Sequence, residues 1–186
     1  MNRKILSLFL AMTMVCSLSM SVMATDITTD GGNSEVPVEL TAEAATFSVT
    51  VPTALPIDVA ADGTVTTADD AKIVNNSHGA VMVTNMTIVG ADNWEILDWD
   101  TADMSSEKVG SAKVAMIINN EKTTADDTIT FNQANFPKLD GTSDAISTDE
   151  LAIVYDAKVP AQASAISDLT VANVVFTIGW YVDSSN

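Results

Sequence analysis

Thr46-Phe47-Ser48-Val49-Thr50-Val51 is the stretch that decides the fold, because apolar and hydroxyl side chains alternate strictly along it. Phe47, Val49 and Val51 fall on one face of an extended chain, and the hydroxyl residues fall on the other. A period of two predicts a strand with one buried side and one side in solvent. We therefore expect the fold to be built from sheets.

More stretches rich in Val, Ile and Thr follow, and none of them sustains the apolar repeat of a helix. Turn-forming pairs such as Asn119-Asn120 and Asp140-Gly141 separate them. The predicted strands cover residues 55–59, 64–66, 71–75, 80–89, 94–97, 113–118, 127–131, 151–159 and 169–182. About eight to ten short strands of this kind predict an all-β fold, a single-domain antiparallel β-sandwich over residues 46–186. Residues 119–150 are the least regular part, and we expect a long loop with one short strand there.

The N-terminus has the pattern of a secretory signal peptide over residues 1–24. Arg3 and Lys4 precede an apolar run over residues 5–18, and Val22-Met23-Ala24 resembles a cleavage site. The apolar run is shorter than the roughly 20 residues that a spanning helix needs. Cys16 lies inside this run, so we expect it to be removed with the signal. The pattern predicts a secreted protein.

Residues 25–45 are polar, rich in Thr, Asp and Gly, and without periodicity, which predicts a flexible leader. Residues 36–40 (VPVEL) are a candidate short strand within it, able to pack or pair with another element.

The composition that remains after cleavage limits the kind of protein. Removal of residues 1–24 leaves 162 of the 186 residues, with no cysteine and no arginine. It also removes two of the eight basic residues and none of the 25 acidic ones, so the net charge changes from −17 to −19. A secreted chain without cysteine depends on its core rather than on disulfides. The charge argues against nucleic acid or anionic membranes as partners, and no membrane insertion of the mature chain is expected.

Residues that could support catalysis are few. His78 is the only histidine and lies in the turn-like sequence Asn75-Asn76-Ser77-His78-Gly79, where a solvated side chain is expected. Asp98 and Asp100 flank Trp99, and on a strand they would share a face. Glycoside hydrolysis needs two carboxylates about 5–9.5 Å apart across a cleft, which such a pair could supply. Because acids are abundant and arginine is absent, we expect solvated carboxylates here and no enzyme, with a small hydrolase as the remote alternative.

Residues 58–69 are similar to the calcium loops of EF-hands and dockerins. Asp58, Asp62 and Asp69 take loop positions 1, 5 and 12, and Gly63 takes position 6. Ala60 stands at position 3, where calcium needs an oxygen ligand. The Asp62-Gly63 pair is equally typical of a turn between two strands. A calcium site and a plain hairpin both remain open, and no other cofactor is expected.

Aromatic residues are scarce, and each is either a core anchor or part of a sugar-binding surface. We expect Trp180 in the core, because it alternates with Phe176 and Ile178. Trp99, between two aspartates, is the best candidate for an exposed ring. A carbohydrate platform would combine the residues Trp94, Trp99, Tyr155, Asp98 and Asp100.

Trp94-Glu95-Ile96 and Trp180-Tyr181-Val182 are both Trp-x-aliphatic segments, one in mid-domain and one on the last predicted strand. This layout resembles the WxL-domain proteins of low-GC Gram-positive bacteria, although neither segment has the leucine of that motif. The resemblance implies a secreted protein that attaches non-covalently to peptidoglycan, with Trp94 and Trp180 among the contact residues.

These patterns predict a protein that works by binding or assembly. The main hypothesis is a secreted structural or adhesion module at the cell surface, bound to a cell-wall polymer or to surface proteins. Self-assembly is part of this hypothesis, because residues 36–40 could add a strand to the open sheet edge of a neighbouring molecule. The alternative is a carbohydrate-binding module with an aromatic platform.

Overall fold

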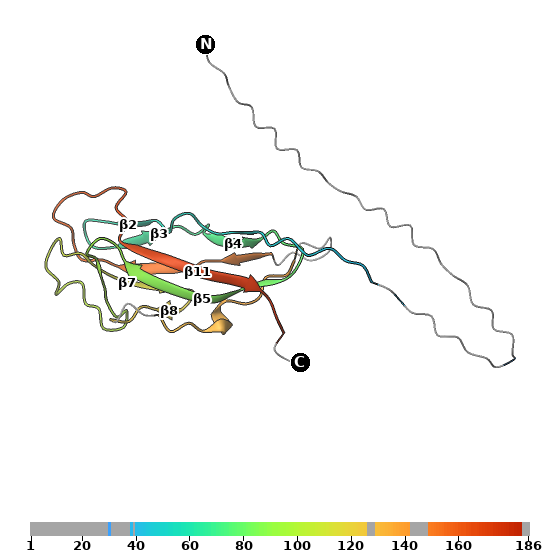
Figure 1. Cartoon of the computed structure of the whole chain (residues 1–186). Helices are drawn as coiled ribbons and strands as arrows, with labels where there is room; N and C mark the ends of the chain where they lie inside the picture. Colours follow the sequence, from blue (N-terminus) through green and yellow to red (C-terminus); the bar gives the residue numbers. More distant parts are fainter. Residues whose placement is uncertain (1–29, 31–37, 39, 126–128, 142–148, 184–186) are drawn as a thin grey trace, which may run out of the picture. The chain divides into compact units, whose positions relative to one another are not determined.

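Figure 1 shows the computed structural model of the chain, which describes residues 30, 38, 40–125, 129–141 and 149–183. The chain divides into two units, residues 1–42 and residues 43–186, and every described strand belongs to the second. The predicted signal peptide and most of the predicted leader lie outside the described residues. The second unit confirms the all-β prediction and is sandwich-like, and its one described helix is the 3-10 turn Gln133–Asn135.

The strands form four hydrogen-bonded groups in the described part of the chain. One sheet has the order β1-β4-β9, and another has the order β10-β7-β6 with β8 paired to β7; β5 pairs with β11, and β2 pairs with β3. Their bounds are β1 Val49–Thr50, β2 Ile57–Val59, β3 Val65–Thr67, β4 Lys72–Asn75, β5 Val81–Gly90, β6 Glu95–Ile96, β7 Lys113–Ile118, β8 Glu121–Lys122, β9 Glu150–Ala152, β10 Tyr155–Lys158 and β11 Ala172–Trp180. All pairings are antiparallel except that of β6 with β7.

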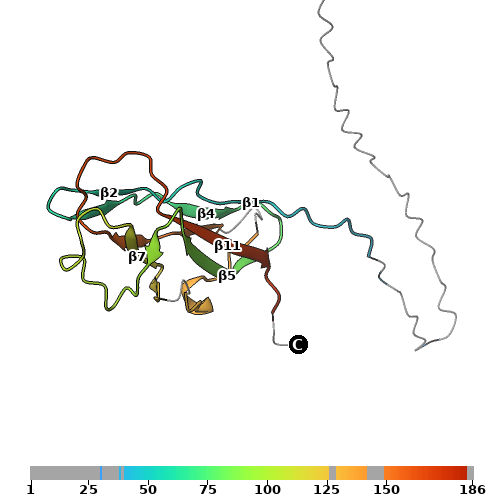
Figure 2. The same cartoon turned by 60° about the vertical axis from the view of Figure 1, so that its left-hand side comes forward.

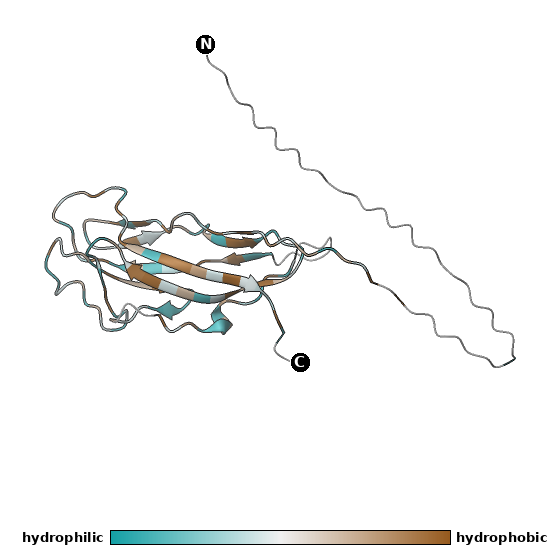
Figure 3. Ribbon diagram, in the orientation of Figure 1, coloured by the Kyte–Doolittle hydropathy of each residue, from teal (hydrophilic) through white to brown (hydrophobic). Residues whose placement is uncertain are grey.

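The longest ladder joins β5 to β11, which lie side by side in Figures 1 and 2. It runs from the pair Ala172 and Gly90 to the pair Trp180 and Val81. The register shifts between Thr177 and Ile178, because β5 contributes one extra residue, Thr84, at that point. Figure 3 shows that both strands are largely apolar with polar residues interspersed, and the exposure of their side chains alternates along most of β11, as a period of two predicts.

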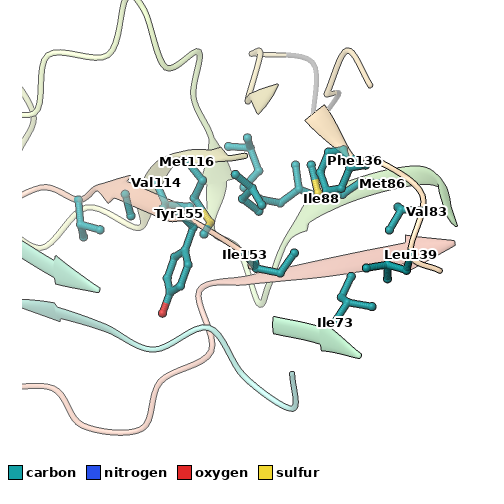
Figure 4. Packing of buried hydrophobic residues seen from close by; sticks show 14 of the residues in the cluster. Ile73, Val83, Met86, Ile88, Val114, Met116, Phe136, Leu139, Ile153 and Tyr155 are labelled. Carbon is teal, nitrogen blue, oxygen red and sulfur yellow. The ribbon is translucent and has the colours of Figure 1, made fainter. Parts of the chain in front are cut away.

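The core lies beneath this ladder and takes side chains from every sheet except the β2–β3 pair, whose residues pack at its margin. Figure 4 shows Val83, Met86 and Ile88 of β5 near Phe136, and Val114 and Met116 of β7 near Tyr155. The buried residues of the cluster are Ile73, Val81, Val83, Met86, Ile88, Ile96, Val114, Met116, Ile118, Phe136, Leu139, Ile153, Tyr155, Ala157 and Val159. A continuous apolar interior of this kind holds the unit together without disulfides.

A buried polar cluster ties β1 and β4 to the segment around residue 140. The Asn75 side-chain amide donates to the carbonyl oxygens of Gly79 (2.9 Å) and Asp140 (3.0 Å), and its oxygen accepts from the Ser77 N–H (2.9 Å). The Ser77 hydroxyl donates to the Ser48 carbonyl at 3.0 Å. Because Asn75 and Ser77 are fully buried, these bonds replace water for groups that would otherwise be unsatisfied.

Three predicted strands differ most from the observed ones. Of residues 46–51, only Val49–Thr50 form a strand, and the expected burial of one face is wrong for Phe47 and Val51, which are each 43 % exposed. Residues 151–159 form two strands in different sheets, β9 and β10, because the Asn119 side chain bonds the backbone between them: Asn119 Oδ1 accepts from the Val154 N–H at 2.8 Å. In the predicted strand 127–131, Ile129 makes only an isolated bridge with Thr123, and residues 127 and 128 lie outside the described residues. The short strand β8 was not predicted.

Candidate functional site

Trp94 and Trp99 are both half-buried, so neither presents a free ring. Trp94 packs against the edge of the core cluster. The Lys158 ammonium lies 4.6 Å from the centre of the Trp99 ring and also donates to the Trp99 carbonyl oxygen at 2.6 Å. A cation seated on the ring face by such a contact occupies the surface on which a sugar would stack. The expectation that Trp99 is the best exposed ring is therefore wrong.

Asp98 and Asp100 lie in a turn rather than on a strand, so the expected shared strand face does not exist. One carboxylate oxygen of Asp98 accepts from the backbone N–H groups of Asp100 (2.9 Å) and Thr101 (3.1 Å). The Asp100 carboxylate pairs with the Lys122 ammonium at 2.5 Å on the surface. Asp98 stabilises the turn and Asp100 forms an exposed ion pair, and the two carboxylates do not form a facing catalytic pair.

Tyr155 is buried in the core and cannot belong to an exposed sugar platform. Its hydroxyl donates to the Pro56 carbonyl oxygen at 2.6 Å and accepts from the Ala68 N–H at 3.2 Å. Burial raises the pKa of the phenol above its ordinary value of 10.0. The side chain anchors the β2–β3 hairpin to the core, which is a structural role.

The predicted calcium loop is a β-hairpin. Asp58 lies on β2 opposite Thr66 of β3, and Gly63 adopts a left-handed φ of 86° in the turn. The Asp62 carboxylate accepts from the backbone N–H of Thr64 at 2.9 Å, and bonds from the Thr64 backbone and side chain lower its pKa. Asp58, Asp62 and Asp69 do not gather into one site, and across the described residues no three acidic, histidine or cysteine side chains are placed to hold a metal ion.

Trp180 lies at the surface, with 38 % of its area exposed, so its predicted place in the core is wrong. It ends β11, beyond the last core contacts of that strand. Its ring meets the Phe47 ring edge to face, with the centroids 5.1 Å apart, and its six-membered ring lies against Gly79. Phe47 is itself 43 % exposed, so the pair forms an accessible aromatic surface.

Tyr181 follows Trp180 in the chain but points to the opposite side, since neighbouring residues of an extended chain alternate in direction. It is 38 % exposed, and its backbone N–H donates to the Ala80 carbonyl at 2.9 Å. The Lys138 ammonium lies 5.5 Å from its ring centre. We call Phe47, Trp180, Tyr181 and Val182 the aromatic end. No spacing in the sequence predicts it, because the approach of Phe47 to Trp180 depends on how β1 and β11 pack.

The outer edge of β11 is the second notable feature of this region. Among the described residues, β5 is the only strand that pairs with β11. The N–H of Ala91 donates to the carbonyl of Val171, so residues 91 and 171 form a hydrogen-bonded pair at one end of the ladder. This pair shows which residues of β11 direct their backbone groups toward β5. Because the pairs alternate in an antiparallel ladder, the backbone groups that point away from β5 are those of residues 172, 174, 176, 178 and 180. None of them has a backbone partner in the described part of the chain.

Two shallow hollows, of about 310 and 330 Å³, open elsewhere on the surface. The first is lined by segments 102–104 and 156–159 and holds the carboxylates of Asp103 and Asp156. Hydrogen bonds from the Ser105 hydroxyl and N–H lower the pKa of Asp103. These bonds show that the carboxylate stabilises the turn to which it belongs. The Asp156 carboxylate likewise accepts from the adjacent Ala157 N–H at 2.7 Å. His78, the only histidine, is exposed.

The aromatic end and the open strand edge both belong to β11. No helix in the described residues is long and apolar enough to span a membrane. Comparisons with protein-family models, with curated proteins and with solved structures gave no match.

Proposed function

We propose that this protein is a secreted, non-catalytic module of the cell surface, which attaches to a cell-wall polymer or assembles with surface proteins through β11. The observation that carries the proposal is the chemistry of this strand. Residues 171–182 contain no charged side chain in a chain with 25 acidic residues, and they end in exposed aromatic rings. Uncharged, aromatic surface of this kind is typical of contact sites rather than of ordinary solvated surface.

The resemblance to WxL-domain proteins supports the wall-binding form of this proposal. Of the two Trp-x-aliphatic segments, Trp180-Tyr181-Val182 is exposed at all three residues, whereas Trp94 is half-buried and Ile96 is buried. We therefore assign the contact to the second segment. The signal peptide pattern at residues 1–24 supplies the expected route to the surface.

The test is a pull-down of the mature chain, residues 25–186, with purified Gram-positive cell wall and with a panel of insoluble polysaccharides. We expect binding to cell wall that withstands 0.5 M salt, because the aromatic end is uncharged, and that falls at least about tenfold in Trp180→Ala, a loss of about 1.4 kcal/mol. The matched control is Trp99→Ala, since that ring is covered by Lys158. Equal loss in both variants, or no wall binding by the parent chain, would contradict wall attachment.

A carbohydrate-binding module is the second candidate, and the Phe47–Trp180 pair favours it because sugars stack on exposed rings. In that case the mature chain should bind one polysaccharide of the panel in the absence of cell wall, and Trp180→Ala should abolish that binding. Calcium should leave either result unchanged, because residues 58–69 form a hairpin.

A further inference from the structure

The open edge of β11 lacks the features that keep sheet edges from pairing. Natural edge strands are kept short or carry Lys, Pro or inward-pointing charges. β11 has nine residues with neither charge nor proline, and Val175 on its solvent face is 54 % exposed. The end strands of the other sheets are shorter: β6 and β8 have two residues each and β9 has three. The other strand of this sheet, β5, is also long and uncharged, but on its far edge Val81 exchanges backbone hydrogen bonds with Leu139. Among the described residues, β11 is thus a long, uncharged edge without such a bridge.

The inner face of β11 is also less well covered than that of its partner. On β5, Val81, Val83, Met86 and Ile88 are at most 1 % exposed. On β11, the inward-facing residues are all only half-buried, although they pack on the same core: Ala172, Val174, Phe176 and Ile178. Both rows face the same interior, so the difference arises at the outer edge of β11, where no further strand covers the core. One additional strand would bury this apolar row.

A segment with the matching pattern precedes the first strand of the folded unit in the sequence. Residues 25–45 show no periodicity as a whole, but their last part does. In residues 38–46, which we call the arm, Val38, Leu40, Ala42 and Ala44 alternate with Glu39, Thr41 and Glu43. Val38 is 96 % exposed and Leu40 is 89 % exposed. Residues 43–46 take part in no strand of the folded unit. The arm therefore has the period of a half-buried strand, and its described residues belong to no strand.

We propose that the arm of a second copy of this protein pairs as an additional strand with the outer edge of β11. Val38, Leu40, Ala42 and Ala44 would face the half-buried inner row, and the acidic residues would face solvent. An arm of nine residues spans about 30 Å when extended, the length of a nine-residue strand such as β11. No charge on β11 opposes Glu39 or Glu43. This inference rests on the proposed structural role and names a second copy of the chain as the partner.

The pairing is heterologous, because the donor arm and the acceptor edge are different parts of the molecule. Each copy could therefore accept one arm and donate its own, which produces chains of copies unless two copies exchange arms reciprocally. Pairing of β11 with β11 of another copy is the competing arrangement, and it would leave the apolar residues of both arms in water. Burial of those residues favours the arm as the occupant.

Point variants test the donor side without disturbing the fold, because the arm lies outside the strands. Sedimentation of the mature chain, residues 25–186, should show assembly that increases with concentration. Leu40→Asp should weaken the association at least tenfold, since it places a charge against the apolar row. Thr41→Asp adds the same charge at the solvent-facing position and should assemble like the parent chain. Assembly that survives Leu40→Asp, or a parent chain that stays monomeric at about 1 mM, would overturn the proposal.

Complementation tests the two sides together. Val174→Pro removes an N–H of the outer edge while leaving the ladder to β5 intact, so it should accept no arm but still donate its own. Mixed with Leu40→Asp, which accepts but does not donate, it should give a one-to-one heterodimer that native mass spectrometry identifies by mass. Each variant alone should be monomeric. Absence of the heterodimer, with both variants folded by circular dichroism, would overturn the proposal.

Amide hydrogen exchange supplies a readout that needs no variant in β11. On assembly, the N–H groups of Val174, Phe176 and Ile178 should become protected, whereas those of Val175 and Thr177 should be protected at every concentration. Protection of the outer N–H groups in a monomer would mean that the chain's own arm covers the edge, and this would overturn the intermolecular form. Wall binding by the Leu40→Asp variant, measured in the pull-down above, reports on the proposed function separately.

Discussion

Asn75 shows how one buried side chain can hold together parts of the chain that are distant in sequence. Its amide satisfies the carbonyl oxygens of Gly79 and Asp140, and its own oxygen takes up the Ser77 N–H. From an alternating pattern one can predict on which face of the strand residue 75 lies, and nothing more. The pattern does not predict that a polar residue at a core position is satisfied by a loop some 65 positions further along.

We predict that Asn75→Ala destabilises the folded unit by about 2–4 kcal/mol, because it leaves several buried polar groups without partners. The measurement is urea unfolding followed by tryptophan fluorescence. Asn76→Ala is the control, since Asn76 is exposed and its side chain bonds only to the exposed Thr50 hydroxyl; a loss of less than about 0.5 kcal/mol is expected for it. Similar losses in the two variants would contradict the role of the buried cluster.

Tyr155 leads to a prediction about alkaline pH. Burial raises the phenol pKa in the folded state, whereas the unfolded chain ionises at about pH 10. The unfolded state therefore loses its proton first, and the stability supplied by Tyr155 is complete below pH 10 and lost as pH rises through the folded-state pKa.

The Tyr155→Phe variant should lack this part of the alkaline loss in a series of melts between pH 8 and pH 11. At neutral pH it should be less stable by about 1–2 kcal/mol, because the bonds to Pro56 and Ala68 are gone. Parallel stability curves for variant and parent above pH 10 would show that the phenol does not titrate on unfolding.

At the scale of elements, the close approach of β5 to the chain that follows it depends on Gly90. A Cβ atom on Gly90 would lie 2.0 Å from the Trp94 carbonyl oxygen, a backbone atom that cannot simply rotate away. This contact is set by the turn at residues 91–94, in which Asp92 and Asn93 both have positive φ angles. A glycine at the end of a strand therefore marks a packing requirement here.

We predict that Gly90→Ala costs about 1–3 kcal/mol, the usual range for overpacking a well-packed site. Gly179→Ala is the matched control in the paired strand, because its Cβ would meet only the Thr84 methyl group at 3.8 Å, an ordinary contact. The control should be neutral or slightly stabilising, since alanine is less costly than glycine within regular structure. Thermal unfolding of both variants checks the difference. A Gly179→Ala variant less stable than Gly90→Ala would show that the turn at Trp94 can shift to accommodate the added methyl group at little cost.

The sequence predicts elements best where periodicity is local and long. The content of Val, Ile and Thr along residues 80–89 and 169–182 predicts β5 and β11 to within about three residues at each end. The run 151–159 is periodic, yet it divides into β9 and β10, because the distant Asn119 side chain bonds the backbone at Val154. A local sequence pattern does not contain information about such a long-range contact. The division of residues 151–159 into two strands could therefore not be predicted.

The site was harder to predict than the fold, for the same reason. Trp180 has the spacing of a core residue, but it lies past the end of the core, where Phe47 covers it only in part. Trp99 has the polar neighbours of an exposed ring, but Lys158 lies over it. Both outcomes depend on which residue of another strand lies nearby, and that follows from sheet packing rather than from the residue types beside the tryptophan.

At the scale of the whole molecule, charge controls how closely copies approach. The chain from residue 25 carries a net charge of −19, from six lysines and 25 acidic residues, so copies repel one another at long range. The proposed contact between arm and β11 has no ion pair on the acceptor side. Added salt should therefore weaken only the repulsion between the negatively charged copies and leave the contact itself unchanged.

We predict that assembly of the mature chain strengthens between 20 mM and 500 mM NaCl, because the screening length falls from about 20 Å to about 4 Å over this range. Sedimentation velocity at a fixed protein concentration provides the measurement. Dissociation at high salt would indicate instead that the copies are held by charge pairs, such as Lys138 with a neighbouring carboxylate.

The ladder between β5 and β11 also decides when the molecule can fold. Its paired residues are separated by about half of the chain, as Trp180 with Val81 illustrates, and strand pairings over such distances form slowly. During synthesis from the N-terminus, the core beneath β5 stays open until residues 172–180 have emerged. We therefore expect the nascent chain to stay unfolded for most of its synthesis, which would suit the passage through a secretion channel that the proposed function implies.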